Sequence, residues 1–298
     1  MGESVGEAEV SLRREDLGRL VVRCPDQPGI IAAVSGFLFE HGANIVHSDQ
    51  HSTDPAGGRF FLRIEFALAD VEARLPGLRQ RFAEVAAASQ MDARFSTVRE
   101  RRRVAIYVSR EDHCLLELLW HRSAGEIPAE FVCVIGNHPE LAEIVRPWSI
   151  PFHHVPTGPG TKQEAEARQQ EILASYGVEL VVLARYMQVL SPDFVAGWQG
   201  RAINIHHSFL PAFAGARPFR QASVRGVKLI GATAHYVTGE LDAGPIIEQD
   251  VHRVDHRHDV ADLRRISRQI ERTVLARAVT WHLEDRVIID GNRTVVFD

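Results

Sequence analysis

The chain has 298 residues, 45% of them hydrophobic and 24% charged, which is typical of a globular protein with room for two domains and excludes a largely disordered chain. Its formal net charge of −5 argues against a general nucleic-acid surface, so no nucleic-acid partner is expected. No apolar run approaches the roughly 18–20 residues of a membrane span, and the acidic segment from Glu3 to Glu9 is unlike a secretory signal, so we expect a cytoplasmic protein without a membrane partner.

The N-terminal third of the chain shows element signals in the order strand, helix, strand, strand, helix, strand. Strands are predicted at Gly18–Arg23, Ile45–Thr53, Arg59–Ala67 and Ala93–Val98, and helices from about Pro28 to His41 and over Val71–Ala88. This order is typical of a ferredoxin-like βαββαβ unit, in which two helices cover one face of an antiparallel sheet. We place this first domain at residues 10–98.

Two turns in this unit carry a family resemblance. The turn Asp26–Ile30 has the pattern D-x-P-G-I, the turn His41–Ile45 reads H-G-A-N-I, and both resemble the ACT domain, a regulatory module that binds amino acids. The resemblance implies a homo-oligomer, because the ligand sites of such domains usually lie between subunits. It also implies an effector site at Asp26, Pro28, Gly29, Ile30, Asn44 and Ile45. A dimerisation sheet without a bound effector fits the pattern equally well.

Beyond a charged connector at Glu100–Arg103, short apolar strands alternate with helices. Strands are predicted at Val104–Val108, Phe131–Ile135, Val178–Leu183 and Ala202–Ile205, with helices at Cys114–Trp120, Glu164–Ala174 and Phe194–Trp198 between them. The remaining elements are strands at Lys228–Val237 and Pro245–Val254, a helix at Asp259–His282, and a hairpin of Val287–Ile289 with Thr294–Phe297 that turns at Asp290-Gly291. Such alternation implies βαβ crossovers, so we expect a second, α/β domain with a mostly parallel sheet at residues 103–298.

The strand Ala202–Ile205 runs into a cluster of polar, titratable side chains. Asn204 and His206 are two residues apart, so they project from the same face of an extended strand. Asp242 lies further along, on a turn punctuated by Gly244 and Pro245. Ligands of α/β sheets usually bind just beyond the carboxyl ends of strands, so Asn204, His206 and Asp242 are the candidate catalytic residues.

These three side chains suit the attack of water on a formamide carbonyl. Attack builds a negative oxygen, which the Asn204 amide and a protonated His206 can both stabilise. Asp242 can orient the water or hold His206 in its working tautomer. This chemistry needs no metal and no covalent nucleophile, but the same residue types also permit an esterase-like site or a proton shuttle.

A second resemblance narrows this choice. Four segments resemble the formyltransferase fold that includes glycinamide ribonucleotide transformylase and methionyl-tRNA formyltransferase: Asn204–Pro211, Leu241–Pro245, Val182–Pro192 and Gly231–Thr238. The resemblance covers about residues 103–285 and implies a Rossmann-like domain. Joined to an ACT-like domain, it resembles the formyltetrahydrofolate deformylase family. These hydrolases of a C–N bond convert 10-formyltetrahydrofolate to tetrahydrofolate and formate, and they serve one-carbon metabolism and purine biosynthesis.

The same resemblance implies roles for individual residues. It assigns catalysis to Asn204, His206 and Asp242. It assigns folate binding to Arg185, Tyr186, Met187, Gln188, Val189, Leu190 and His235. Folate is then a substrate, and neither a cofactor nor a metal is expected. The three cysteines lack a C-x-x-C pair and are interpreted as reduced, mostly buried thiols, and His252, His256 and His258 as a surface cluster rather than a metal site.

One turn departs from the ribonucleotide transformylases. In those enzymes a glycine-rich turn after the first strand opens a helix whose N-terminal amides hold the acceptor's phosphate. The corresponding turn here, Ser109–Cys114, has no glycine, and Glu111 and Asp112 repel a phosphate. We therefore expect water to be the acceptor. The alternatives are a formyltransferase with a small amine acceptor and a folate sensor without turnover.

Overall fold

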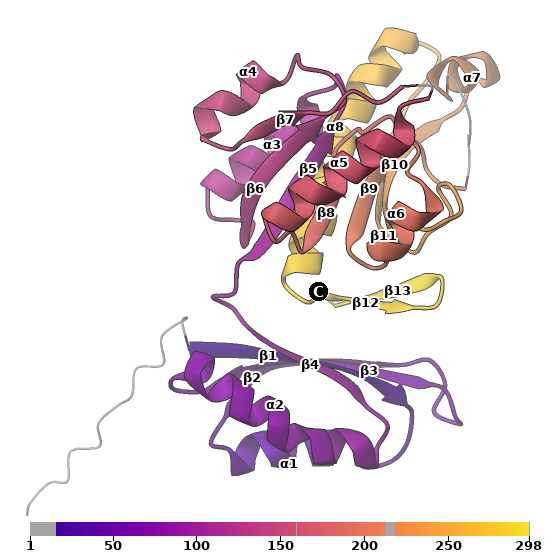
Figure 1. The fold of residues 1–298 in the computed structure, drawn as a ribbon. Helices are drawn as coiled ribbons and strands as arrows, with labels where there is room; N and C mark the ends of the chain where they lie inside the picture. The colour runs from indigo at the N-terminus through magenta and orange to yellow at the C-terminus, as the bar shows by residue number, and fades with distance from the viewer. Residues whose placement is uncertain (1–15, 159, 212–217, 298) are drawn as a thin grey trace, which may run out of the picture. The chain divides into compact units, whose positions relative to one another are not determined.

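The computed structural model describes residues 16–158, 160–211 and 218–297, and the chain divides between Glu100 and Arg101 into two compact units (Figure 1). Each unit has its own sheet and its own hydrophobic core. This division lies in the interval between the two predicted domains, 10–98 and 103–298. Residues 10–15, 159, 212–217 and 298 of those ranges lie outside the described part of the chain.

The first unit is a four-stranded antiparallel sheet in the order β2-β3-β1-β4. Its strands are β1 (Leu17–Pro25), β2 (Asn44–Ser52), β3 (Arg59–Ala67) and β4 (Asp92–Thr97). Two helices, α1 (Ile30–Glu40) and α2 (Val71–Ala88), lie together on one face of the sheet (Figure 1). Alternate residues of β1 and β3 point toward these helices and form the core with them, among them Leu20, Val22, Leu62 and Ile64. The predicted βαββαβ unit is confirmed.

Glycines mark both ends of α1. Gly29 precedes the helix with φ 93°, and Gly42 follows its last turn with φ 73°. Both values lie in the left-handed region that favours glycine, so both ends of the helix depend on it. The predicted end at His41-Gly42 is confirmed. The predicted start near Pro28 is two residues too early, because the left-handed Gly29 separates Pro28 from the first helical residue, Ile30.

The second unit is built on a seven-stranded sheet in the order β11-β10-β9-β8-β5-β6-β7. Its strands are β5 (Arg102–Val108), β6 (Ala129–Gly136), β7 (Phe152–His154), β8 (Leu180–Leu183), β9 (Ala202–His206), β10 (Leu229–Tyr236) and β11 (Ile246–Arg253). The pairs from β7 across to β9 are parallel, whereas β9–β10 and β10–β11 are antiparallel. The predicted, mostly parallel Rossmann-like sheet is therefore confirmed.

The strand order reverses direction at β5. After β5 the chain adds β6 and β7 on one side, and it then returns to add β8 and β9 on the other. The carboxyl ends of strands at such a reversal form the crevice in which open α/β sheets usually bind ligands. Here the two connections meet directly, because the backbone N–H of Met187, after β8, donates to Ser109 Oγ, after β5, over 2.9 Å.

Helices cover both faces of this sheet. On one face α3 (His113–Ser123) and α8 (Val260–Leu283) pack on residues such as Ile106, Val182 and Ile203. On the other face α5 (Lys162–Ser175) and α6 (Pro192–Gly197) pack on residues such as Tyr107 and Val181. The predicted α8 begins as expected, since the Asp259 side chain caps it in a reciprocal pair with Asp262.

Several short elements of this unit are not predicted. They are α4 (Ala142–Val145), the 3-10 turn η2 (Arg146–Trp148), β7 and α7 (Pro218–Arg225). Three of them, α4, η2 and β7, have only three or four residues and are too short to show a helical or strand period. The C-terminal hairpin of β12 (Val287–Asp290) and β13 (Arg293–Val296) forms, but its loop is Gly291-Asn292, since Asp290 pairs with Arg293. The predicted turn at Asp290-Gly291 is one residue early.

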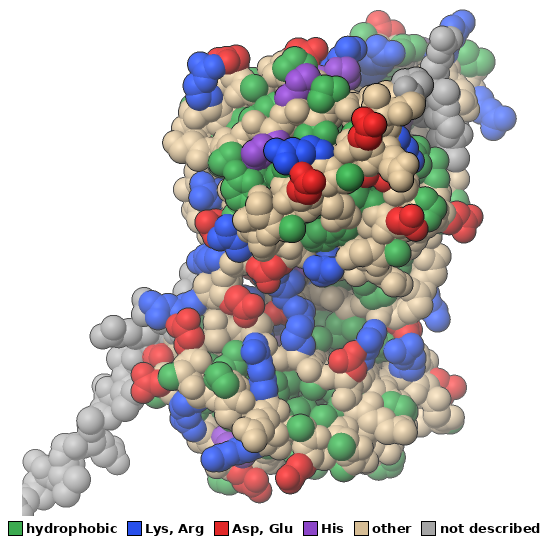
Figure 2. Space-filling view, viewed as in Figure 1, with side chains coloured by type: hydrophobic (Ala, Val, Ile, Leu, Met, Phe, Trp, Pro, Cys, Tyr) green, Lys and Arg blue, Asp and Glu red, His purple; other side chains and the backbone are tan. Residues whose placement is uncertain are grey.

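The distribution of charged side chains and the burial of the cysteines agree with what the sequence predicts. Blue and red side chains are interspersed over the face in Figure 2, and no continuous basic stretch covers the described residues there. Within the described ranges, no helix combines the length and the apolar character needed to cross a bilayer. Cys24, Cys114 and Cys133 are all buried free thiols, as predicted.

Candidate active site

The register between β9 and β10 places the central polar residues. β9 and β10 are antiparallel, with Asn204 opposite His235 and His206 opposite Thr233. Ile203 and Ile205, on the other face of β9, join the core beneath α8. The predicted alternation therefore places Asn204 and His206 on one face, and the sheet adds His235 beside them.

The surroundings of His235 fix the protonation of its ring, and the ring in turn orients Asn204. His235 Nδ1 lies 2.9 Å from the Tyr236 carbonyl oxygen, which only accepts, so this nitrogen carries a proton. Burial lowers the pKa of His235, so its ring is neutral and Nε2 is an acceptor. Nε2 accepts from Asn204 Nδ2 over 3.2 Å. One amide hydrogen of Asn204 is thus oriented by His235, and the other is left for a ligand.

His206 and Asp242 form the second pair of the site. His206 Nδ1 lies 3.2 Å from Asp242 Oδ2. The hydrogen bond from His206 holds the pKa of Asp242 below its usual range, so the carboxylate is ionised. The other carboxylate oxygen lies 3.8 Å from His235 Nε2. His206 Nε2 is buried and has no hydrogen-bond partner among the described residues, so it is free to meet a reactant.

A close backbone approach brings Asp242 to His206. Asp242 lies in the connection between β10 and β11, where the Tyr236 N–H donates to the Pro245 carbonyl over 2.9 Å. A Cβ at Gly244 would lie 1.8 Å from the Tyr236 carbonyl oxygen, so glycine alone permits this approach. Asp242 itself has φ 55°, a left-handed value that aspartate tolerates better than most residues.

Thr233 and Gln249 anchor the segment that follows His206. The Thr233 hydroxyl donates to the Ser208 carbonyl over 2.9 Å and accepts from the Leu210 N–H over 3.1 Å. Gln249 Nε2 donates both to the Leu210 carbonyl, at 3.0 Å, and to the Thr233 hydroxyl, at 2.9 Å. Neither anchoring residue has a chemical motif of its own. Only the position of Thr233 within the Gly231–Thr238 segment could have pointed to it.

A partly open cavity, about 440 Å³ when the space open to solvent is included, lies beside Asp242. Four of the predicted folate-binding residues line it: Gln188, Val189, Leu190 and His235. Its other walls are the end of β8, α6 and the connection that carries Asp242, contributed by Leu183, Val195, Val237, Thr238, Gly239, Glu240, Leu241 and Asp242. An apolar cavity that ends at a few convergent polar groups is the usual form of a small-molecule site.

The other predicted folate-binding residues lie elsewhere. Tyr186 is buried, its hydroxyl accepts from Gln169 Nε2 over 3.0 Å, and its ring packs edge-on against Tyr107. The Met187 side chain is exposed and does not line the cavity. Arg185 does not line the cavity and pairs instead with Glu271, whose Oε2 lies 3.2 Å from its Nε. The structure thus brings together only part of the predicted set.

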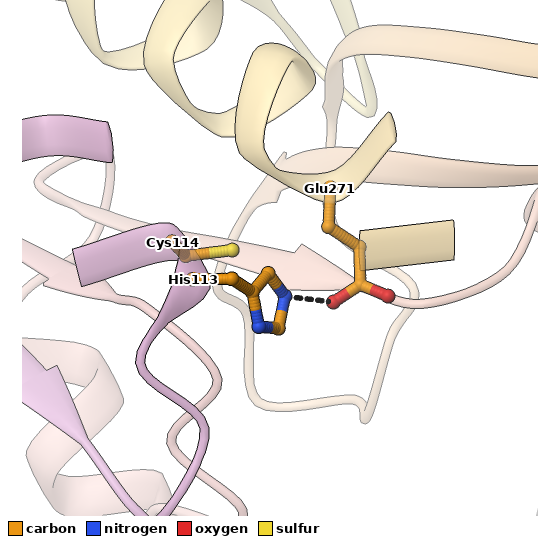
Figure 3. A group of neighbouring side chains, drawn as sticks. All are labelled: His113, Cys114 and Glu271. Carbon is orange, nitrogen blue, oxygen red and sulfur yellow. Dashed lines mark hydrogen bonds and ion pairs between the residues drawn. The ribbon is translucent and has the colours of Figure 1, made fainter. Parts of the chain in front are cut away.

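Among the described residues, one group of potential metal ligands lies together: His113, Cys114 and Glu271, whose ligand atoms are within 4.8 Å of one another (Figure 3). His113 Nε2 donates to Glu271 Oε2 over 2.9 Å. Burial raises the pKa of the Cys114 thiol well above its usual range, so it stays protonated. The Arg185 cation beside Glu271 would repel a metal ion. The charges of this group therefore disfavour a metal ion.

Residues predicted to bind an effector do not converge within one chain. β1 and β2 both pair antiparallel with β3, and both begin opposite Ala67. The turn Asp26–Ile30 follows the end of β1, where Asp26 accepts a hydrogen bond from Ser52, whereas Asn44 and Ile45 begin β2. The two parts of the predicted site therefore lie at opposite ends of the sheet.

Comparison with known proteins agrees with this architecture. Residues 102–279 match the formyl transferase family, and residues 18–82 match the ACT domain family. The chain is 57% identical over 284 residues to the formyltetrahydrofolate deformylase of Bacillus subtilis (strain 168), with 95% of each chain covered. The chain belongs to the formyltetrahydrofolate deformylase family. It is also 43% identical over 290 residues to the member from Escherichia coli (strain K12).

A solved deformylase structure matches more of this chain than a solved transformylase structure does. A formyltetrahydrofolate deformylase from Pseudomonas syringae pv. tomato superimposes with a TM-score of 0.90 at 46% identity, covering 95% of this chain and 94% of that one. Glycinamide ribonucleotide transformylase 1 from Symbiobacterium toebii superimposes with a TM-score of 0.63 at 32% identity and covers 68% of this chain. The full two-unit chain is thus matched by the deformylase.

Proposed function

We propose that this protein hydrolyses 10-formyltetrahydrofolate to tetrahydrofolate and formate, with water as the formyl acceptor. The observation that carries the proposal is the pairing of His206 with an ionised Asp242 at the end of the cavity, next to an Asn204 amide oriented by His235. These groups provide hydrogen-bond donors and a base within one small volume. Membership of the deformylase family supports the same substrate.

In the first step the water oxygen attacks the formyl carbon. Asp242 takes a proton from the water through the carboxylate oxygen that does not face His206. The carbonyl oxygen becomes an oxyanion, which accepts hydrogen bonds from the free N–H of Asn204 and from Nε2 of a protonated His206. Both donors are held before substrate arrives, so little reorganisation is needed.

In the second step the tetrahedral intermediate collapses. The bond between the formyl carbon and the folate nitrogen breaks, and its electron pair remains on that nitrogen, which receives the proton held by Asp242. Formic acid then loses its proton to solvent. The balance is one water consumed, with tetrahydrofolate, formate and one proton produced, and it needs no metal, redox partner or covalent enzyme intermediate. We therefore propose that the enzyme works without a cofactor.

The folate is proposed to occupy the cavity formed by Gln188–Leu190 and the connection before β11. Its apolar lining suits a flat aromatic ring system. His235 and Asp242 lie at the end of the cavity where the formyl group is proposed to react. The proposed contribution of His235 is therefore to orient Asn204 rather than to exchange a proton, because its Nε2 is engaged by the Asn204 amide and its Nδ1 by the Tyr236 carbonyl.

The first unit is proposed to bind an amino-acid effector across a homo-oligomer interface. Since Asp26–Ile30 and Asn44–Ile45 lie at opposite ends of one sheet, a single chain cannot place both against one small ligand. Two chains that align opposite ends of their sheets can do so. Light scattering with and without amino acids tests the assembly. We also propose that the enzyme works in the cytoplasm, which suits its three buried free thiols.

The deciding experiment is formate release from 10-formyltetrahydrofolate by the purified full chain with no acceptor added. Stoichiometric formation of formate and tetrahydrofolate over many turnovers supports hydrolysis. Tight folate binding without formate release would instead support the folate sensor. Formate release that requires an added amine, with the formylated amine as product, would support the transferase.

A further inference from the structure

A single hydrogen bond does not fix the orientation of the His206 ring. A histidine side chain turns about two bonds, and the second of these has no sharply preferred angle. His206 Nδ1 lies 3.2 Å from Asp242 Oδ2, but such a bond stays favourable up to about 30° from linear. The nitrogen that is proposed to meet the oxyanion, Nε2, has no hydrogen-bond partner among the described residues. A further contact is therefore needed to hold the tilt of this ring.

The ring of the next residue, His207, lies against the His206 ring. The two ring centroids are 5.0 Å apart, and the ring planes are inclined by only 29°, so the rings are stacked. Consecutive residues of a strand point to opposite faces, so neighbouring rings on a strand do not meet in this way. Here they do, because β9 ends at His206 and the chain bends at His207 and Ser208. The stack therefore depends on the bend.

Contacts from three elements hold this bend and the His207 ring. From β10, the Thr233 hydroxyl donates to the Ser208 carbonyl over 2.9 Å. From β11, Gln249 Nε2 donates to the same hydroxyl over 2.9 Å. On α7, the partly buried ring of Phe219 lies against the His207 ring with centroids 5.8 Å apart. His207 is thus held through its neighbouring backbone by the sheet and through its ring by a helix.

His207 is uncharged next to a histidine that is proposed to carry a proton. Burial, followed by the charges of Arg185 and His206, lowers the pKa of His207 to about 4, although Glu271 and Asp242 act in the opposite direction. The His207 ring is therefore neutral at neutral pH and does not place a second positive charge against a protonated His206. The face of a neutral aromatic ring instead attracts a cation. The stack thus suits His206 with or without its second proton.

We propose that His207 is a positioning residue, whose flat ring sets the tilt of the His206 ring and so directs Nε2 to the formyl oxygen. Asp242 holds the ring at Nδ1 and His207 holds its plane, and together the two contacts define its orientation. A donor held in its working geometry before substrate arrives needs little reorganisation. His207 is not among the described residues that line the cavity beside Asp242, so it acts through His206 rather than on folate. This inference rests on the proposed hydrolysis of 10-formyltetrahydrofolate.

The test separates the flat ring of His207 from its bulk and from its imidazole chemistry. His207→Phe keeps a flat ring but has no titratable nitrogen, whereas His207→Leu fills the space without a flat face. For each full-length variant, kcat and KM are measured for formate release from 10-formyltetrahydrofolate. Calorimetric titration with tetrahydrofolate counts the folded sites, so kcat is expressed per folded site. His252→Leu, at an exposed position of β11, is the matched control for replacing a histidine.

We expect His207→Phe to retain kcat within about threefold of the unaltered chain, and His207→Leu to lose about tenfold to a hundredfold. KM should change by less than about twofold in both variants, because the folate cavity is untouched, and His252→Leu should behave like the unaltered chain.

Equal kcat values for His207→Phe and His207→Leu would overturn the inference. Two normal values would show that the His207 ring does not orient His206, and two low values would show that the imidazole itself is required. A raised KM with normal kcat would also overturn it, because His207 would then act on folate. If the unaltered chain released no formate without an acceptor, the proposed function itself would be refuted.

Discussion

His206 ends β9 and Asp242 follows β10, yet Asp242 Oδ2 lies 3.2 Å from His206 Nδ1. This contact lowers the pKa of Asp242 below its usual range, so the carboxylate remains ionised across neutral pH. It also directs the free Nε2 of His206 away from Asp242, where it can meet an oxyanion. In the proposed mechanism the pair therefore acts as a unit, in which Asp242 positions the ring and supplies the base.

Asp242→Asn should abolish most turnover while leaving folate affinity nearly unchanged. The amide has almost the volume of the carboxylate, but it cannot take a proton from water and does not stabilise an imidazolium. We expect kcat to fall by about four orders of magnitude, by analogy with removal of other carboxylates that orient a catalytic histidine. Steady-state kinetics and folate binding by calorimetry measure the two effects separately. Asp193→Asn, at an exposed position of α6, is the control. Equal losses of kcat and affinity would contradict the assigned role.

The partly buried His207 ring should make the protein less stable in mild acid. Its folded pKa, about 4, is below its unfolded value of 6.5, so the unfolded chain binds the proton first as the pH falls. Stability is therefore complete above pH 6.5 and declines as the pH falls from 6.5 toward 4, by up to about 3 kcal/mol. Denaturant unfolding of the unaltered chain and of His207→Gln across this range measures the difference. Parallel stability curves for the two proteins would show that His207 is not the group responsible.

Local sequence patterns were sufficient to predict the main helices and strands, and to place Asn204 and His206 on the same face of a strand. Alternation along β9 places Asn204 and His206 together without any knowledge of the tertiary structure. The left-handed Gly42 that ends α1 is likewise a local signal. Asp242 needed more, because no local rule relates it to His206; it entered the predicted site through its Gly/Pro-punctuated turn and through the resemblance of that turn to the formyltransferase fold.

Partners that are distant in sequence could not be predicted. The Asn204–His235 hydrogen bond depends on the register of β10 against β9, and the His113–Glu271 bond joins helices at opposite ends of the second unit's sequence. The direction in which a side chain points also depends on residues that are distant in sequence. Tyr186 lies in the predicted folate-binding segment, but Tyr107 and Gln169 hold it in the core. Sequence identifies the segment, whereas packing decides which of its residues face the cavity.

Gly244→Ala should displace Asp242 and lower stability together. The added Cβ would lie 1.8 Å from the Tyr236 carbonyl oxygen, a backbone atom that cannot move without breaking the start of the β10–β11 connection. Overpacking of this kind costs about 1–3 kcal/mol, and the shift of the carboxylate away from His206 should lower kcat by at least about tenfold. Thermal unfolding and kinetics provide both readouts.

Gly197→Ala is the matched control for this substitution. No atom lies within 4 Å of a Cβ added at Gly197, at the end of α6, so stability and turnover should be unchanged. If Gly244→Ala behaved like this control, the close approach to Tyr236 would not be what positions Asp242.

Thr233→Val should loosen the segment that follows His206 without changing any group that touches substrate. Valine has nearly the shape of threonine but cannot donate to the Ser208 carbonyl or accept from the Leu210 N–H and Gln249. A buried donor left without its acceptor costs about 1–3 kcal/mol, so a clear fall in the midpoint of denaturant unfolding is expected. Because Thr233 lies opposite His206 in the β-ladder, kcat should fall as well, while KM changes little.

Thr273→Val separates this effect from the general loss of a hydroxyl. Among the described residues, the Thr273 hydroxyl bonds to the Gln269 carbonyl of its own helix, on the exposed side of α8, so its removal should leave stability and kcat unchanged. A fall in stability with normal kcat in Thr233→Val would mean that the segment after His206 is held in place by other contacts. A fall in both would show that the hydrogen bonds of Thr233 and Gln249 hold the segment after His206 in the position that turnover requires.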